Sequence, residues 1–151
     1  MQKFQLELWF QIIGIGSASG LLFKNDALFI ISDNSKALYE YNMTDKKLEA
    51  HQLIENAELP QDNIPKKLKP DFESITSYGE DVCVFGSGST ENRNKMVQFN
   101  TYNKKVVKAL DLADLYLSMQ YFANIKPEDF NIEGAIFTGE VWYFFQRGNG
   151  A

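Results

Sequence analysis

The sequence predicts an all-β protein made of repeated four-stranded antiparallel units, and three observations lead to this prediction. A stretch of fifteen residues recurs three times without a gap. Turn-forming residues separate short apolar runs at the spacing of hairpins. Aromatic residues make up 14% of the 151 residues, and they are mostly Phe and Tyr, which favour strands. The hydrophobic fraction of 44% is enough for a core, which argues against a disordered chain.

The repeat aligns three stretches that begin at Ser19, Glu73 and Glu133. Apolar residues share columns through all three copies, and each copy has an acidic residue in its turn column. A β-sandwich with chance similarity is the weaker interpretation, because the match is gapless in three copies. The aligned stretches read SGLLFKNDALFIISD, ESITSYGEDVCVFGS and EGAIFTGEVWYFFQR.

The first elements follow in chain order. Apolar residues alternate with others from Phe4 to Ile12, which predicts a strand over residues 4–13. The first unit then begins at Ser19. Its turns are expected where Asn and Asp cluster between the apolar runs. After the first strand, the strands of this unit are predicted over 27–32, 37–42 and 47–53.

The second unit begins near residue 73 and the third near residue 133. Between them, residues 111–123 predict a helix, because Asp111 can cap its start and an apolar stripe falls on one face. We interpret the stripe as core packing. The third unit has two of its four strands by residue 151. The stripe consists of Leu112, Leu115, Tyr116, Met119 and Phe122.

Four-stranded antiparallel units of this length are typical of β-propeller blades. The chain holds about two and a half units, whereas propellers use roughly four to eight blades. Residues 1–151 are therefore expected to form a single partial propeller, either a natural half or a piece of a longer protein. Exposed edges predict self-association, and the strand over 4–13 could supply a missing strand in its own chain or in a partner.

Two columns of the repeat are predicted to meet at one edge of the units. The first strand of each unit forms a hairpin with the second, so the start of one lies beside the end of the other. In a propeller the first strand lines the central channel, and both columns would face one channel mouth. One column contains Ser19, Glu73 and Glu133, and the other contains Asp33, Ser87 and Arg147.

Glu73 and Glu133 would approach each other from neighbouring units. Two carboxylates at such a short distance raise each other's proton affinity unless a cation lies between them. Arg147 and Arg93 are the candidate protein cations, and Ca²⁺, which prefers oxygen ligands, is the candidate metal. An alternative is that each Glu accepts backbone N–H bonds and ties neighbouring units together.

Composition excludes several classes of protein. The net charge is −5 and no basic block occurs, which argues against nucleic-acid binding. A single Cys allows no intramolecular disulfide, and with one His it allows no Cys/His zinc site. No apolar run is long enough to span a membrane, and Gln5, Glu7 and Gln11 interrupt the apolar stretch that a signal peptide would need. The default expectation is a cytoplasmic protein.

Several of these stretches also carry a family resemblance. DFESI, VFGSGST-x-x-R, NIEGA and FFQRGNGA are similar to segments of an uncharacterised bacterial β-propeller family, which is related to esterase-like and phytase-like propellers. The resemblance covers roughly residues 19–151. It implies a propeller whose channel mouth is acidic and suited to calcium, with Glu73 and Glu133 matching the family motif.

Three functions are compatible with these features. The first is a module that binds a small anionic ligand or an ion. The second is a calcium-assisted phosphoester or ester hydrolase, in which Glu73 and Glu133 hold the metal while Arg147 and Arg93 bind the substrate. The third is a structural module whose open edges recruit a partner. The residues expected to bind the ligand are Glu73, Glu133, Arg147, Asp33, Ser87 and Arg93.

Overall fold

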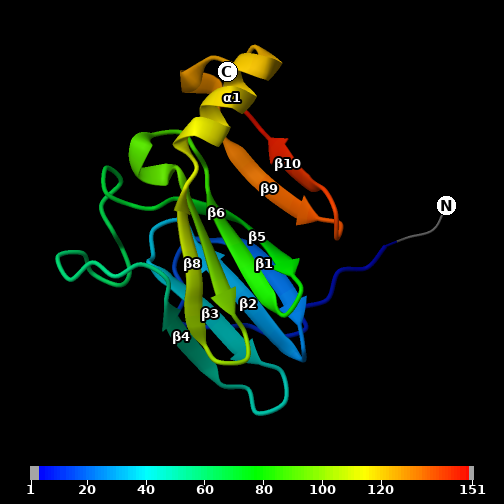
Figure 1. Ribbon diagram of the computed structural model, residues 1–151. Helices are drawn as coiled ribbons and strands as arrows, with labels where there is room; N and C mark the ends of the chain where they lie inside the picture. Colours follow the sequence, from blue (N-terminus) through cyan, green and yellow to red (C-terminus); the bar gives the residue numbers. More distant parts are fainter. Residues whose placement is uncertain (1–3, 150–151) are drawn as a thin grey trace.

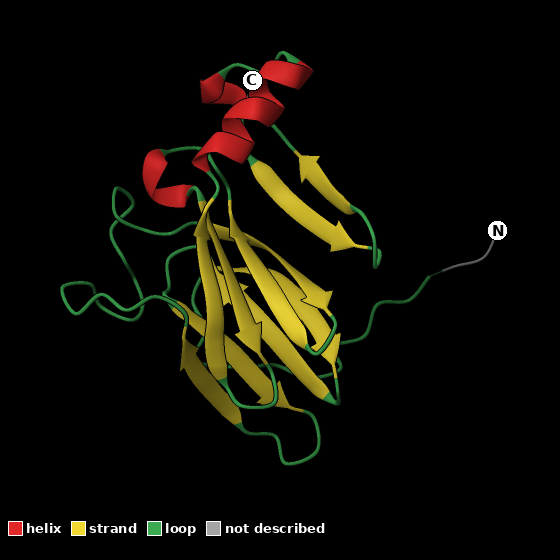
Figure 2. Ribbon diagram, in the orientation of Figure 1, coloured by secondary structure: helices red, strands yellow, loops and turns green. Residues whose placement is uncertain are grey.

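The computed structural model describes residues 4–149, and these form three antiparallel sheets and one α-helix (Figures 1 and 2). We call the sheets unit 1, unit 2 and unit 3 in chain order. Unit 1 has the strand order β1-β2-β3-β4, unit 2 has β5-β6-β7-β8, and unit 3 pairs β9 with β10. The strands are β1 (Ala18–Lys24), β2 (Ala27–Ser32), β3 (Ala37–Asn42), β4 (Leu48–Gln52), β5 (Phe72–Tyr78), β6 (Asp81–Gly86), β7 (Lys95–Asn100), β8 (Lys105–Asp111), β9 (Ile132–Phe137) and β10 (Trp142–Gln146).

The first hairpin of each unit has the same irregularity. In unit 1 the register passes from Ala18 opposite Ser32 to Gly20 opposite Ile31, so Ser19 has no partner of its own. The same shift leaves out Glu73 in unit 2 and Glu133 in unit 3. These three residues are therefore β-bulge residues, each an extra residue in the first strand of its unit.

The units pack face to face, with β5 lying between β1 and β9. Side chains alternate across β6 because successive residues of a strand point to opposite faces. Val82 and Val84 pack with unit 1, against Phe29 and Ile31 among others. Cys83 and Phe85 belong to the core shared with unit 3 and the helix. Because its side chains alternate between the two faces of the sheet, β6 contributes to both cores.

The sequence prediction of an all-β protein with four-stranded antiparallel units agrees with the structure. The sheets do not close into a ring within residues 4–149. The arrangement of three stacked antiparallel sheets, with β1, β5 and β9 adjacent, is compatible with a propeller-like fold.

The predicted strand over residues 4–13 is wrong, because the described residues 4–13 form no strand. This segment (blue in Figure 1) extends from unit 1 and its start points away from the sheets. Phe10 stacks on Tyr41 with ring centroids 5.7 Å apart, and Ile12 packs beside Ile30. These residues lie on the face of unit 1 and not at the edge of a sheet. Alternation of side chains does not by itself make a strand, because the backbone must also pair with a neighbouring strand.

Helix α1 (Ala113–Ala123) follows β8 and covers one end of units 2 and 3 (Figure 2). Leu112 occupies the N-cap position and not Asp111, but the carboxylate of Asp111 accepts a 2.8 Å hydrogen bond from the N–H of Ala113 and so satisfies the first donor of the helix. The predicted apolar face is only partly buried. Tyr116 is buried, whereas Phe122 is 93% exposed. No helix in the described part of the chain is long and apolar enough to cross a membrane.

Candidate functional site

The three bulges lie around one groove. Its volume is about 280 Å³, and its lining includes Ser19, Glu73, Ser74 and Glu133. A β-bulge commonly re-aims a side chain at a functional site. The hydroxyl of Ser19 donates a 2.5 Å hydrogen bond to the carbonyl of Phe72, which ties unit 1 to unit 2. The structure therefore places the first predicted column at one groove, with a carboxylate from each of units 2 and 3.

The second column lies beside the first through a repeated backbone contact. The N–H of Asp33 donates to Ser17, that of Ser87 donates to Asp71, and that of Arg147 donates to Asn131, at 3.0 to 3.2 Å. Each acceptor lies two residues before a bulge residue. The three pairs occupy matching positions, so the repeat extends to a third column that contains Ser17, Asp71 and Asn131.

Asp71 is the centre of the charged cluster between units 1 and 2. Its carboxylate contacts the ammonium of Lys69 at 2.6 Å and the guanidinium of Arg93 at 3.0 Å. Lys69 also contacts Asp33 at 2.5 Å, so it bridges two carboxylates. Ser87 donates a 2.6 Å hydrogen bond from its hydroxyl to Asp71. The buried carboxylate of Asp71 thus holds Lys69, Ser87 and Arg93 together, and Lys69 links this group to Asp33.

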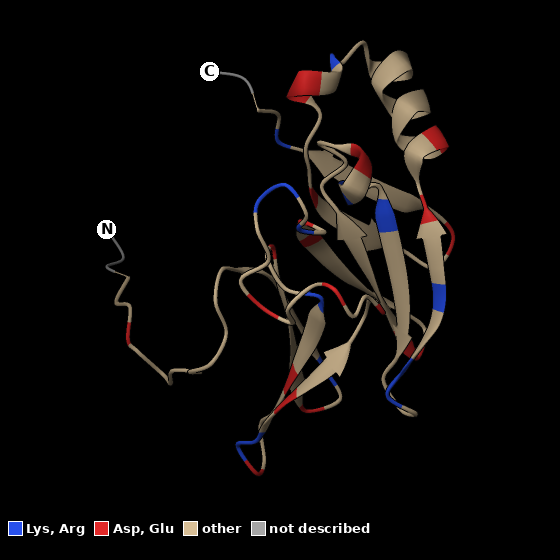
Figure 3. Cartoon of the chain, turned by 90° about the vertical axis from the view of Figure 1, so that its left-hand side faces the viewer, with Lys and Arg blue, Asp and Glu red and all other residues tan. Residues whose placement is uncertain are grey.

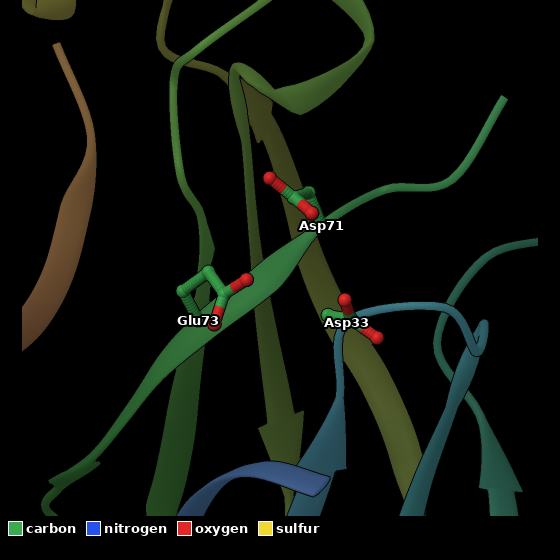
Figure 4. A group of neighbouring side chains, drawn as sticks. All are labelled: Asp33, Asp71 and Glu73. Carbon is green, nitrogen blue, oxygen red and sulfur yellow. The ribbon is translucent and has the colours of Figure 1, made fainter. Parts of the chain in front are cut away.

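Carboxylate oxygens of Asp33, Asp71 and Glu73 lie within 4.8 Å of one another (Figure 4). Asp33 follows β2, Asp71 precedes β5, and Glu73 lies in β5. One oxygen of Asp33, Oδ1, is buried and has no hydrogen-bond partner in the described part of the chain. Three carboxylates at this distance repel one another when they are ionised, and a bound cation would relieve that repulsion.

Glu133 has its own partners in unit 3. Its Oε1 accepts a 2.7 Å hydrogen bond from the side-chain amide of Asn131 and lies 3.2 Å from Nε of Arg147. Arg147 is therefore the cation that meets Glu133, as one prediction allowed. Its side chain is 67% exposed, so the contact is solvated.

Glu73 is the least neutralised acid of the group. Burial, together with the charges of Asp71, Glu133 and Asp33, raises its pKa to about 7, and only Lys69 acts in the opposite direction. The cluster contains four acids and three bases. The bases contact the other three acids, so Glu73 is the acid without a paired base, and the cluster gains an excess negative charge when Glu73 loses its proton. The acids are Asp33, Asp71, Glu73 and Glu133, and the bases are Lys69, Arg93 and Arg147.

The ties between units are made by residues next to the two glutamates. The N–H of Asp71 donates to the carbonyl of Asp33 at 3.1 Å, and the N–H of Ile132 donates to that of Ser87 at 2.8 Å. These bonds join unit 1 to unit 2 and unit 2 to unit 3. The tying role that was the alternative for Glu73 and Glu133 is therefore filled by backbone groups of their neighbours.

Arg93, the second candidate cation, contacts Asp71 and not one of the two predicted glutamates. It reaches Asp71, and its guanidinium also donates to the hydroxyl of Ser89 at 2.7 Å and to the carbonyl of Lys66 at 3.1 Å. The loop that contains Ser87 and Ser89 is held against the helix by Gly88, whose positive φ of 75° brings it against Tyr116 and Phe130. This loop is part of the packed core and fixes both Ser87 and Arg93.

Sequence reasoning missed Lys69 and Asp71. Lys69 lies in a polar insert that has no repeat partner. Asp71 had a detectable signal, because it falls in the same column as Ser17 and Asn131, two residues before each bulge. Outside this cluster, acidic and basic segments are interspersed along the chain (Figure 3).

Comparison with models of protein families assigns the chain to a family. The model of a family of unknown function (DUF6929) matches residues 14–151. No curated protein matches the chain. The matched residues include all three units and every residue of the charged cluster. The chain therefore belongs to the DUF6929 family of unknown function.

Proposed function

We propose that the chain is a cation-binding module with a propeller-type arrangement of its units, and that Glu73 is the principal ligand. The observation that carries the proposal is the charge balance around Glu73. Its partly buried carboxylate faces Asp71, Asp33 and Glu133, while the three nearby bases contact those other acids. A bound cation would supply the missing charge.

Calcium is the first ion to test. It takes six to eight oxygen ligands, including carboxylates that bind through one or two oxygens. Asp33, Asp71 and Glu73 already have oxygens within 4.8 Å of one another, and Asp33 Oδ1 is buried without a partner. Glu133 lines the groove of the three bulges together with Glu73 and would be a further ligand. Calcium would compete with Lys69 for Asp33 and Asp71, so moderate affinity is expected.

The contacts of the two arginines support a cation over an anion. Arg93 is engaged with Asp71, Ser89 and a backbone carbonyl, and Arg147 contacts Glu133. A phosphoester hydrolase would use these guanidinium groups to bind its substrate. Because both are already paired with carboxylates, we propose binding and do not propose hydrolysis.

The propeller-type arrangement is supported by the stacking of the units. β1, β5 and β9 are neighbours, and each begins at the groove with a bulge. In such an arrangement the groove would lie at the mouth of the central channel, which is where propellers commonly bind ligands.

Calorimetric titration with Ca²⁺ tests the proposal. We expect saturable binding to the unmodified chain and at least a tenfold weaker association for Glu73→Gln, which removes the charge and keeps the shape. Glu140→Gln is the matched control, because Glu140 is an exposed acid in a turn of unit 3. Equal calcium binding by all three chains, or none by the unmodified chain, would contradict the proposal.

A further inference from the structure

We propose that Lys69 determines which cations the site at Glu73 accepts. Its ammonium takes the place of a bound cation between Asp33 and Asp71, and only an ion of higher charge gains by displacing it. This inference rests on the proposed cation binding and deepens it, because it names divalent metal ions as the ligand class and Lys69 as the residue that excludes monovalent ions.

The ammonium of Lys69 lies between two of the three acids that would hold a metal ion. Its Nζ is 2.5 Å from Oδ2 of Asp33 and 2.6 Å from Oδ1 of Asp71. The side chain of Lys69 is 14% exposed, so little water reaches these contacts. The same two carboxylates have oxygens within 4.8 Å of Glu73 (Figure 4). Lys69 and a metal ion bound at Glu73 therefore require the same ligands.

Too few oxygens are available to a metal ion while Lys69 stays in place. Oδ2 of Asp71 already contacts a guanidinium at 3.0 Å and a hydroxyl at 2.6 Å. Of the three carboxylates, Oδ1 of Asp33 and the two oxygens of Glu73 then have no contact with a base in the described part of the chain. Calcium takes six to eight oxygen ligands. Displacement of Lys69 would add Oδ2 of Asp33 and Oδ1 of Asp71, so a chelated ion has to displace it.

Charge decides which ion can do this. When Asp33, Asp71 and Glu73 are all ionised, the contacts with Lys69 and Arg93 leave one negative charge without a partner. A monovalent ion in place of Lys69 does not change this balance, and it must also compete with an ammonium that is tethered to the site. A divalent ion supplies the missing charge, and a partly buried site makes that gain larger than it would be in water. The exchange therefore favours divalent ions.

Displacement of Lys69 requires movement of its side chain and not of its loop. The backbone beside it is held by other residues. The carbonyl of Lys66 accepts a 3.1 Å hydrogen bond from Arg93, and the carbonyl of Lys67 accepts a 3.0 Å hydrogen bond from Asn92. A lysine has a flexible aliphatic stem, so its ammonium can move into solvent while these bonds remain.

Competition with sodium tests the selectivity. Calcium affinity is measured by calorimetry in tetramethylammonium chloride and in sodium chloride of equal ionic strength. For the unmodified chain we expect the two values to agree within about twofold, because screening is the same in both salts. Lys69→Met keeps the stem and removes the charge, so it should bind calcium at least about tenfold more tightly in the first salt and lose at least about threefold in sodium. Lys67→Met is the matched control, because Lys67 is an exposed lysine of the same loop, and it should behave as the unmodified chain does.

Acetylation of the unmodified chain gives a second measurement that needs no variant. The chain is treated briefly with acetic anhydride in a chelator or in saturating calcium, and mass spectrometry measures the modification of each lysine. Lys69 is paired and mostly buried, so it should react slowly in the chelator. Calcium should release its amine into solvent and increase its modification by at least about tenfold, while Lys67 reacts equally under both conditions.

The outcomes separate this inference from the proposed function. Equal calcium affinity of the unmodified chain and Lys69→Met would overturn the role of Lys69 and leave cation binding intact. So would a Lys69 that stays protected from acetylation in saturating calcium, or a Lys69→Met chain that is as insensitive to sodium as the unmodified chain. Absence of calcium binding by both chains would overturn the inference and the proposed function together.

Discussion

Ser87 and Asp71 are joined twice, once through the backbone and once through their side chains. The N–H of Ser87 donates to the carbonyl of Asp71 at 3.0 Å, and its hydroxyl donates to the carboxylate at 2.6 Å. Ser87 follows the second strand of unit 2 and Asp71 precedes the first. The double link closes the hairpin at the charged cluster, and it makes both residues sensitive to substitution.

Ser87→Ala should lower the free energy of unfolding by about 1 to 3 kcal/mol, because a buried hydrogen bond to a charged group is lost. Denaturant unfolding measures the change. Ser118→Ala is the control, since Ser118 is an exposed residue of α1 whose hydroxyl bonds only to a backbone carbonyl. Comparable losses in the two variants would show that the link to Asp71 contributes nothing specific.

Asp71→Asn should be the more damaging substitution, with a loss of about 3 to 5 kcal/mol. It leaves Arg93 and one side of Lys69 without their buried carboxylate. Asp71 has a left-handed backbone conformation with a φ of 53°, which Asn also tolerates. The loss of stability would therefore come from the missing charge and not from backbone strain. Asp45→Asn, in the exposed pair with Lys47, should cost less than about 0.5 kcal/mol. Thermal and denaturant unfolding should rank the two in this order.

Glu73→Gln should stabilise the metal-free protein above pH 7. The pKa of Glu73 rises from 4.5 to about 7 on folding, so the folded state holds this proton more tightly than the unfolded state does. Stability is therefore lost as the pH rises from about 4.5 to 7, and the loss persists above pH 7. The glutamine variant avoids this loss, which we put at about 1 kcal/mol because the side chain is partly solvated.

Melting temperatures measured in a chelator at several pH values test this. The two chains should melt alike near pH 4.5 and diverge up to pH 7. A difference that does not change with pH would contradict the role given to ionised Glu73. Excess calcium should then raise the melting temperature of the unmodified chain alone.

Gly88→Ala should cost more than about 2 kcal/mol. A methyl group there would lie 2.6 Å from the rings of Phe130 and Tyr116, and φ is 75°. Gly79→Ala is the matched control, because Gly79 also has a positive φ, of 56°, but has open space around it. The control should show only the conformational cost of about 1 to 2 kcal/mol. Equal losses would mean that the contact with the two rings can relax.

Cys83 should not react with thiol reagents at pH 8 in the folded protein. Burial and the charge of Asp81 raise its pKa to about 12, so very little thiolate forms. Labelling rates with and without denaturant measure this, and labelling should follow unfolding. Rapid labelling of the native chain would show that the core between units 2 and 3 opens readily.

The repeat explains why much of the fold could be predicted. A gapless alignment fixed the first hairpin of every unit, because the same apolar columns recur at the strand period. It placed Glu73 and Glu133 beside one groove and Arg147 beside Glu133 for the same reason. The strand prediction for residues 4–13 was wrong because alternation describes only the side chains of a strand. A strand also requires a neighbouring strand with which its backbone can pair.

The contacts of the charged cluster could not be predicted from the sequence. Lys69 reaches Asp33 from a polar insert, and this contact depends on how that loop folds back between units 1 and 2. The pattern of a loop carries no such information. Likewise, the partners of Arg93 follow from the packing of the loop around Gly88 against Tyr116 and Phe130. Such long-range contacts have no counterpart in residue spacing.

The bulges at Ser19, Glu73 and Glu133 separate the chemistry of the groove from the pairing of the strands. Each is a surplus residue, so its side chain is not required to match a cross-strand neighbour. Ser in unit 1 and Glu in units 2 and 3 occupy the same position within one strand geometry. A protein built this way can exchange the side chains at its groove one unit at a time, and so change what it binds, while the sheets that carry them keep their register.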